Sequence, residues 1–271
     1  CQRLSSIIIP EGVERISDFA FSGCSGLNSV IMTDGIVTIG EGAFSGCRCL
    51  NAITIPESLD SIGEMSFMGC SGLKIITIPK KVKSIGSYAF TGCEELKSVQ
   101  LPNGIKTIST CSFSWCRNLT SVVIPEGVEI IYHDAFYGCN LKEIYIPVSV
   151  TAIYDGAFGC DSINAIYVFS AVPPFIDDYS IPFSGNTYSN ATLYVPEGCV
   201  EAYSSAEGWC QFQNIKTFDT DGVLDILDDS GANVVPISYY NLKGERFDYP
   251  QSGMNIIRYS NGQTKKVLIT E

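Results

Sequence analysis

The sequence predicts a solenoid of short stacked repeats, closed by a C-terminal cap and followed by a small β-domain. Phenylalanine recurs every 23 residues, and once more after a one-residue deletion, at Phe21, Phe44, Phe67, Phe90, Phe113, Phe136 and Phe158. Proline keeps the same period at Pro10, Pro56, Pro79, Pro102, Pro125 and Pro147. Most of the cysteines follow this period as well. A fixed period of about 20–50 residues is typical of solenoids, in which each unit buries its apolar side against its neighbours.

Composition excludes several other classes of protein. The 271 residues carry a formal net charge of −12, and 45% are hydrophobic whereas only 17% are charged. No apolar run approaches the ~18 residues that a spanning helix needs, so no transmembrane segment is predicted. The content of Ile, Val and Phe excludes a disordered chain. The acidic excess argues against a nucleic-acid partner, which requires a basic face, and favours solubility instead.

Each repeat reads L-x-x-I-x-I-P-x-x-V-x-x-I-x-x-x-A-F-x-G-C-x-x, and the third copy begins at Leu50. Ile53 and Ile55 point to one side of a short strand, because side chains alternate along a strand. Pro56 then ends the strand, since proline cannot donate a hydrogen bond to a ladder. The V-x-x-I stretch predicts a second short extended or turn-like segment. The A-F-x-G-C stretch predicts a short helical or turn segment, since it allows one helical turn closed by glycine.

The cysteines are placed by the repeat. Eight of the 12 are periodic, namely Cys1, Cys24, Cys47, Cys70, Cys93, Cys116, Cys139 and Cys160. Successive side chains in a parallel ladder point the same way, which is the wrong geometry for a disulfide. We therefore predict buried free thiols that pack as small hydrophobes. Of the remaining cysteines, Cys199 and Cys210 are close enough in sequence to pair.

The repeat resembles the leucine-rich repeats of the BspA-type family, a bacterial cell-surface class with the pattern L-x-x-I-x-I-P-x-x-V-x-x-I-x-x-x-A-F-x-x-C. The resemblance covers residues 1–168. It implies a right-handed leucine-rich repeat solenoid displayed outside the cell. Minor departures are Thr33 in a proline position, Cys111 in a variable position and Trp115 in a glycine position. We expect the sequence to begin within a repeat, with further copies and a signal peptide upstream of Cys1.

Residues 169–216 predict a C-terminal cap, which the end of a solenoid requires. Pro173-Pro174 is expected to end the solenoid, Leu193-Tyr194-Val195 to form a strand, and residues 197–205 to form a short helix. Trp209 and Phe212 are expected to cover the last repeat. The Pro-Pro, L-Y-V-P and W-x-x-F-x-N-I features are similar to the C-terminal ends of BspA-type arrays.

Residues 217–271 predict a separate small β module. Residues 237–240, 255–259 and 266–269 read as strands joined by Lys-Gly and Asn-Gly turns. The segment resembles the C-terminal sorting-type β modules of secreted proteins in Bacteroidetes-like bacteria; the alternative is a small domain that shields or spaces the solenoid. The stretch Asp219-Thr220-Asp221-Gly222 overlaps a calcium loop, but Thr217 stands at the first ligand position and the closing Glu is absent. No metal site is predicted.

The outward side of the strands is the predicted contact surface, because solenoids of this kind recognise partners along an extended face. The residue between the two inward Ile of each strand points outward. Exposed apolar residues with tyrosines are typical of interaction sites, although Ile, Val, Thr and Tyr also simply favour strands. Tyr145 and Tyr167 are the expected hot spot. The predicted contact residues are Ile8, Ile31, Thr54, Thr77, Gln100, Val123, Glu143, Tyr145 and Tyr167.

The predicted function is a non-catalytic recognition or adhesion module at the cell surface or outside the cell. The family resemblance implies a protein or glycan partner on host or neighbouring cells. The alternative is a structural spacer without a ligand of its own. The chain lacks a nucleophile elbow, a phosphate loop and an HExxH motif, and His133 is its single histidine. Neither catalytic residues nor a cofactor is predicted.

Overall fold

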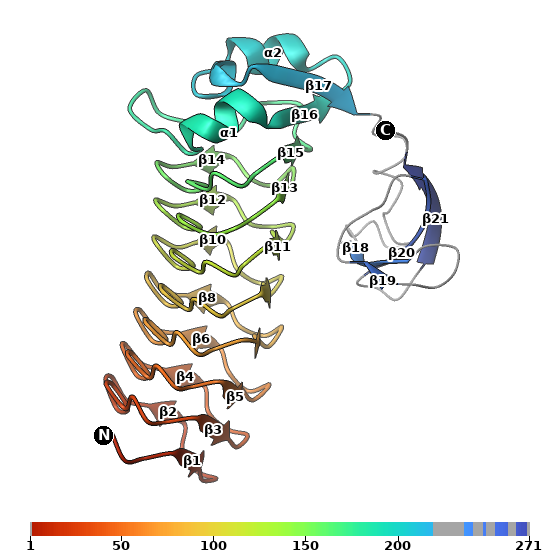
Figure 1. Ribbon diagram of the computed structural model, residues 1–271. Helices are drawn as coiled ribbons and strands as arrows, with labels where there is room; N and C mark the ends of the chain where they lie inside the picture. Colours follow the sequence, from red (N-terminus) through yellow and green to blue (C-terminus); the bar gives the residue numbers. More distant parts are fainter. Residues whose placement is uncertain (1, 219–235, 241–245, 248–252, 260–263, 270–271) are drawn as a thin grey trace. The chain divides into compact units, whose positions relative to one another are not determined.

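The computed structural model describes residues 2–218, 236–240, 246–247, 253–259 and 264–269 (Figure 1). The chain divides into two compact units, Cys1–Lys216 and Thr217–Glu271. The first unit is a parallel β-solenoid of successive rungs, in agreement with the fold class predicted from the 23-residue period (Figure 1). No helix among the described residues is long and apolar enough to cross a membrane.

One strand of each rung belongs to a first parallel ladder. Its strands are β1 Ser6–Ile9, β3 Ser29–Met32, β5 Ala52–Thr54, β7 Ile76–Thr77, β9 Ser98–Gln100, β11 Ser121–Val123, β13 Glu143–Ile146, β15 Ala165–Val168 and β16 Thr192–Pro196. Equivalent residues pair across rungs, so that Ile8 lies beside Ile31 and Ile31 beside Thr54. We call the outward side of these strands the strand face.

The V-x-x-I stretches form a second parallel ladder, so of the two expected forms, extended or turn-like, the extended one is present. Each of its strands has two residues, an outward one and a buried isoleucine. They are β2 Arg15–Ile16, β4 Thr38–Ile39, β6 Ser61–Ile62, β8 Ser84–Ile85, β10 Thr107–Ile108, β12 Ile130–Ile131 and β14 Ala152–Ile153. Such short strands are stable here because the stacked rungs supply both hydrogen-bonding partners.

Of the short helical or turn segments expected at A-F-x-G-C, the structure has turns. These residues form consecutive turns, and we call the row of turns the turn corner. The Phe21 N–H donates to the Ala43 carbonyl of the next rung at 2.7 Å, and the Phe44 N–H donates to Ser66 in the same way at 2.8 Å. Cross-rung bonds of this kind alternate with local ones, since the Ser22 N–H donates to the Phe19 carbonyl three residues back at 3.0 Å. Glycines with positive φ, such as Gly46 at 71°, allow this path.

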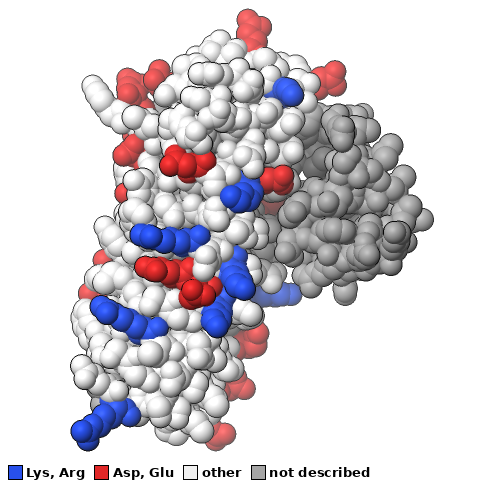
Figure 2. Space-filling view, viewed as in Figure 1, with Lys and Arg blue, Asp and Glu red and all other residues white. Residues whose placement is uncertain are grey.

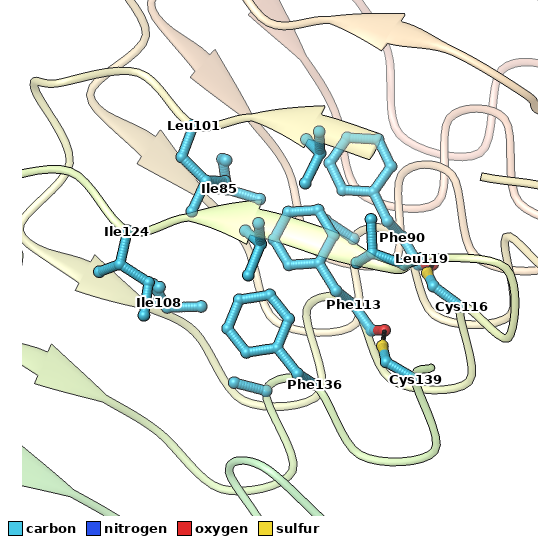
Figure 3. Close-up of a cluster of buried hydrophobic side chains, with 14 of the residues drawn as sticks. Ile85, Phe90, Leu101, Ile108, Phe113, Cys116, Leu119, Ile124, Phe136 and Cys139 are labelled. Atoms are coloured by element: carbon cyan, nitrogen blue, oxygen red, sulfur yellow. Dashed lines mark hydrogen bonds between the residues drawn. The ribbon is translucent and has the colours of Figure 1, made fainter. Parts of the chain in front are cut away.

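The core is built from ladders of identical side chains (Figure 3). The phenylalanines stack as nearly parallel rings, with centroids 5.2 Å apart for Phe67–Phe90 and 5.3 Å for Phe90–Phe113. Beside them, the Cys116 Sγ donates to the Phe90 carbonyl at 3.2 Å, and Cys139 repeats this contact with Phe113 at 3.1 Å (Figure 3). The described ladder cysteines are buried free thiols, as expected: Cys24, Cys47, Cys70, Cys93, Cys116, Cys139 and Cys160.

The ladders continue beyond the Pro173-Pro174 pair. Phe175 pairs with Ala152, and Phe183 pairs with Phe158 and stacks on its ring at 5.6 Å. The strand expected at residues 193–195 is present as β16, which pairs in parallel with β15. The segment from Phe169 onward therefore adds one more rung before the chain covers the end of the stack.

Two short helices, a 3-10 helix and a last strand complete this end. They are α1 Gly185–Asn190, α2 Val200–Ser205, η1 Trp209–Gln211 and β17 Asn214–Phe218. Helix α2 is shorter than the expected 197–205, and α1 was not predicted. Trp209 and Phe212 are buried against Phe183, with ring centroids at 5.7 and 5.2 Å. Their predicted role in covering the last phenylalanine of the stack is confirmed.

The second unit contains a four-stranded antiparallel sheet in the order β19-β18-β20-β21. Its strands are β18 Pro236–Tyr240, β19 Arg246–Phe247, β20 Gly253–Tyr259 and β21 Thr264–Ile269. The three predicted strands are present, and β19 is additional. The Asp219–Gly222 stretch and both predicted turns lie outside the described residues.

Candidate recognition surface

The strand face presents a row of outward side chains, as predicted from the alternation of residues along each strand. Ile8 is 65% exposed, and Ile31, Thr54, Thr77, Gln100 and Val123 are exposed as well. The register places these residues at equivalent positions of successive strands. Large apolar side chains are thus held in water on a rigid backbone.

One residue missed in the prediction adds to this surface. Ile75 immediately precedes β7 and is 67% exposed, slightly more than Ile8. It stands in the row of Ser6, Ser29 and Ala52, where all other copies except the one with Glu143 carry small side chains. Its departure from that small-residue row is the signal that could have identified it.

The tyrosines of the strand face form a stacked column. The ring centroids of Tyr145 and Tyr167 lie 4.9 Å apart with an interplanar angle of 5°. Those of Tyr167 and Tyr194 lie 4.7 Å apart with an interplanar angle of 6°. Tyr194 was not predicted, although Leu193-Tyr194-Val195 repeats the pattern of Ile166-Tyr167-Val168 in exact register. The three rings are half-buried. Tyr145 covers one face of the Tyr167 ring and Tyr194 covers the other.

Glu143 is the one charged member of the predicted set, and it is tied to this column. The Tyr145 hydroxyl donates to Glu143 Oε2 at 2.9 Å. Burial, together with the negative charge of Glu143, raises the pKa of Tyr167 to about 12. The Tyr167 phenol therefore stays protonated at physiological pH.

Ion pairs of the described rungs involve residues in or beside the second ladder. Asp60 accepts Lys81 at 3.6 Å and Lys83 at 3.5 Å, and Lys106 pairs with Glu129 at 3.0 Å. Figure 2 shows positive and negative side chains interspersed over the side of the solenoid in view. Exposed pairs of this kind contribute little to stability. They keep this side of the molecule hydrated. The outward row of the strand face, in contrast, is uncharged.

The buried thiols are poor nucleophiles. Burial raises the pKa of Cys47 to about 11 and that of Cys160 to about 12. Since the thiolate is the reactive form, these groups are inert at neutral pH. Cys199 and Cys210, which were close enough in sequence to pair, are free thiols in the structure.

Two hollows lie on the surface of the first unit. The larger, of about 620 Å³, is lined by Glu11, Met32, Thr33, Asp34, Thr54, Ile55, Pro56 and Glu57. Its carboxylates come from successive rungs, but no cluster of three His, Cys, Asp or Glu residues suited to a metal ion occurs in the described part of the chain. The smaller hollow, of about 350 Å³, lies at the turn corner.

Comparison with known proteins agrees with this architecture. The family model of the BspA-type leucine-rich repeat region matches residues 1–103 and 83–206 with six copies. A leucine-rich repeat protein from Bacteroides ovatus is 28% identical with a TM-score of 0.57, and the match covers 80% of this chain. The chain spans 62% of that protein, less than two thirds of its length. No curated protein sequence matches.

Two further solved structures share lower similarity. A leucine-rich repeat protein from T. pallidum is 27% identical over 61% of this chain and 74% of its own, with a TM-score of 0.49. A leucine-rich cell surface protein from Faecalibacterium prausnitzii is 22% identical over 79% of both chains, with a TM-score of 0.39. The family match ends at residue 206, so the sorting-type resemblance of residues 217–271 stays a prediction. With six matched copies over most of its length, the chain belongs to the BspA-type leucine-rich repeat family.

Proposed function

We propose that this protein is an extracellular recognition module that binds a partner protein through its strand face. The observation that carries the proposal is that four large apolar side chains of this face, Ile8, Ile31, Ile75 and Val123, are exposed to water. Covering such side chains on binding gains about 25 cal/mol per Å² of apolar surface. A repeat solenoid offers this surface over many rungs at once.

The stacked tyrosines favour a protein over a glycan at this face. A sugar ring binds an aromatic side chain through the open face of the ring. On the strand face, Tyr167 is covered on both sides by Tyr145 and Tyr194. The column therefore offers ring edges and hydroxyl groups, which suit the apolar and hydrogen-bonding groups of a protein interface.

An extracellular location is supported by membership of a family associated with cell-surface proteins. The chemistry of the thiols is compatible with an oxidising medium. The ladder cysteines are buried, and burial raises the pKa of Cys47 to about 11 and that of Cys160 to about 12, so the thiolate needed for disulfide exchange is scarcely populated. We propose that the ladder stays reduced outside the cell.

Charged substitutions on the strand face are expected to abolish binding without unfolding the protein. Ile75→Glu and Val123→Glu place carboxylates among exposed apolar residues, where they cost little stability but would have to be desolvated in a complex. We expect each to weaken binding to the best partner on an array of immobilised matrix proteins at least tenfold. The matched control is Val37→Glu, which changes an exposed valine next to the second ladder.

Equal losses in Val37→Glu and the strand-face variants would contradict the assignment of the face. If no matrix protein on the array binds the wild-type chain, the structural spacer becomes the better description. Tyr145→Phe and Tyr167→Phe refine the result, since they keep the ring stack and remove only the hydroxyl groups. Alanine at these positions would remove the stacking as well and would confuse binding with stability.

A further inference from the structure

Three departures from the repeat converge at one place on the turn corner. Other rungs have two residues between the ladder cysteine and the next leucine, whereas Cys139 and Leu141 are separated by Asn140 alone. The F-x-G-C stretch is likewise one residue short at Phe158-Gly159-Cys160. In the preceding rung, Trp115 occupies the position that is glycine in the other copies.

These departures surround the smaller hollow of about 350 Å³. Its lining consists of Trp115, Tyr137, Gly138, Cys139, Asn140, Gly159, Cys160, Asp161 and Ser162. The two shortened segments omit residues that fill the corner in other rungs, which opens the hollow. Because the repeats of one chain share a common pattern, three separate deviations on a single surface point to a selected site.

The tryptophan adopts a backbone conformation that disfavours it. Trp115 has φ 60°, in the left-handed region where Gly46, Gly69 and Gly92 have φ values of 70–71° in the equivalent position. A non-glycine residue costs about 1–2 kcal/mol there. Its side chain is 45% exposed, so burial provides only part of the compensation. Phe19, Tyr88 and other residues of the turns also have positive φ, so what distinguishes Trp115 is that it replaces the glycine of the other copies at this position.

The Trp115 and Tyr137 rings each lie over a glycine of the next rung. The Trp115 ring lies over Gly138, where an added Cβ would come within 2.8 Å of Trp115 Cε3, and Tyr137 lies over Gly159 in the same manner. The two rings meet edge to face, with centroids 5.3 Å apart at 73°. Neither ring belongs to a parallel stack of the kind formed by the strand-face tyrosines. The exposed Arg117 guanidinium lies 5.4 Å from the Trp115 centroid.

Polar groups line the hollow beside the rings. Asn140 contributes an amide, whose Oδ1 accepts from Lys142 Nζ at 2.9 Å. Ser162 donates its hydroxyl proton to the Leu141 carbonyl at 2.7 Å and keeps its lone pairs as acceptors. The Asp161 carbonyl accepts from Asn186 Nδ2 at 2.7 Å, which holds the backbone that carries the Asp161 carboxylate.

We propose that this hollow is a carbohydrate subsite that binds one pyranose ring. A pyranose has an apolar C–H face that packs on an aromatic ring, and a rim of hydroxyl groups that both donate and accept hydrogen bonds. Trp115 and Tyr137 supply the aromatic surface, while Asn140, Asp161 and Ser162 supply donors and acceptors. Sites for small ligands combine an apolar wall with a few oriented polar groups in this way. The exposed Arg117 guanidinium lies over the Trp115 ring and has to move aside for the sugar to pack there.

The site is separate from the strand face, so the inference does not depend on the proposed protein partner. An organic cation is a poorer fit than a neutral sugar, because the positive charge of the Arg117 guanidinium near the Trp115 ring would repel it. A peptide would require a longer groove than the two shortened rungs provide.

The test compares the wild-type protein with Trp115→Gly on an array of neutral glycans built from hexoses and N-acetylhexosamines. Trp115→Gly restores the residue found in the other copies and removes the cost of a non-glycine residue at positive φ, so the variant is expected to fold. We expect the wild-type protein to bind at least one glycan and the variant to lose at least tenfold in affinity. Titration with the corresponding free monosaccharide should change the fluorescence of exposed Trp115 and not that of buried Trp209.

Tyr137→Ser provides the second variant, since Ser22, Ser45 and Ser114 occupy the equivalent position. The strand-face variant Val123→Glu is the control and should bind glycans normally. The inference is overturned if no glycan on the array binds, or if Trp115→Gly binds as the wild type does. Loss of glycan binding in Val123→Glu alone would place the sugar on the strand face. Loss of a protein ligand alone in Trp115→Gly would assign the hollow to a protein partner.

Discussion

Phe90→Ala is expected to lower the free energy of unfolding by about 3–5 kcal/mol, the range found when a buried aromatic side chain is truncated in a close-packed core. Phe90 is fully buried and stacks on both neighbours, with centroids 5.2 Å from Phe67 and 5.3 Å from Phe113. Truncation removes both ring contacts and leaves a cavity in the middle of the column. The rigid rungs on either side, held by cross-rung hydrogen bonds, limit collapse into that cavity.

Urea unfolding followed by circular dichroism measures the effect. Phe175→Ala is the matched control, because it removes the same atoms from a side chain that is 58% exposed, and it should cost less than about 1 kcal/mol. In a solenoid each rung contacts only its neighbours. Because Phe90 lies in a central rung, Phe90→Ala is therefore also expected to broaden the urea unfolding transition, since the rungs on either side of it can unfold separately. A loss as small as that of Phe175→Ala would contradict the structural role of the phenylalanine column.

Raising the pH above 9 is expected to unfold the solenoid steeply. Burial raises the pKa of Cys47 from 9.0 to about 11 and that of Cys160 from 9.0 to about 12. Below pH 9 these thiols are protonated in both states, and their contribution to stability is complete. Between pH 9 and pH 11–12 the unfolded chain loses these protons while the folded chain retains them, so unfolding releases protons and stability falls.

The magnitude is large because several thiols act together. For Cys47 alone, the shift from 9.0 to about 11 corresponds to about 3 kcal/mol. Burial also raises the thiol pKa of Cys70, Cys93 and Cys139. Urea titrations at pH 7, 9 and 11 should show this loss, and a thiol reagent should label the native protein at exposed Cys49 and Cys210 first.

Two variants separate this effect from general alkaline damage. Cys93→Ala removes one buried thiol and should make the pH dependence less steep, although it also lowers stability at pH 7. Cys49→Ser changes an exposed cysteine and should leave the pH dependence unaltered. A stability that is the same at pH 7 and pH 11 would show that the ladder thiols are not buried as described.

Part of the candidate surface could be predicted from residue spacing and part could not. Ile8, Ile31 and Val123 were identified because alternation along a strand determines which side chains point outward. The mutual stacking of Tyr145 and Tyr167 was not predicted, although it decides that their ring faces are covered. Trp115 was recognised only as a departure from the repeat.

The significance of Trp115 depends on positions that are distant in the sequence. Its ring lies over Gly138, and the shortened Phe158-Gly159-Cys160 segment lies on the other side of the hollow. Each departure is minor by itself in the sequence. Only stacking of the three rungs brings them to one surface.

The sequence by itself determined the repeat, the family, the first strand ladder and the buried columns of Phe and Cys. It could do so because a constant period places residue i against residue i+23 in every rung, whatever the local backbone path. Only the tertiary structure decided the path at the turn corner, where the Phe21 N–H bonds to Ala43 in the next rung rather than within a helical turn. That choice depends on competition between local hydrogen bonds and partners that a neighbouring rung supplies. The same dependence on neighbours extended the ladder past Pro173-Pro174, because Phe158 offers an unpaired ring and backbone edge that Phe183 completes.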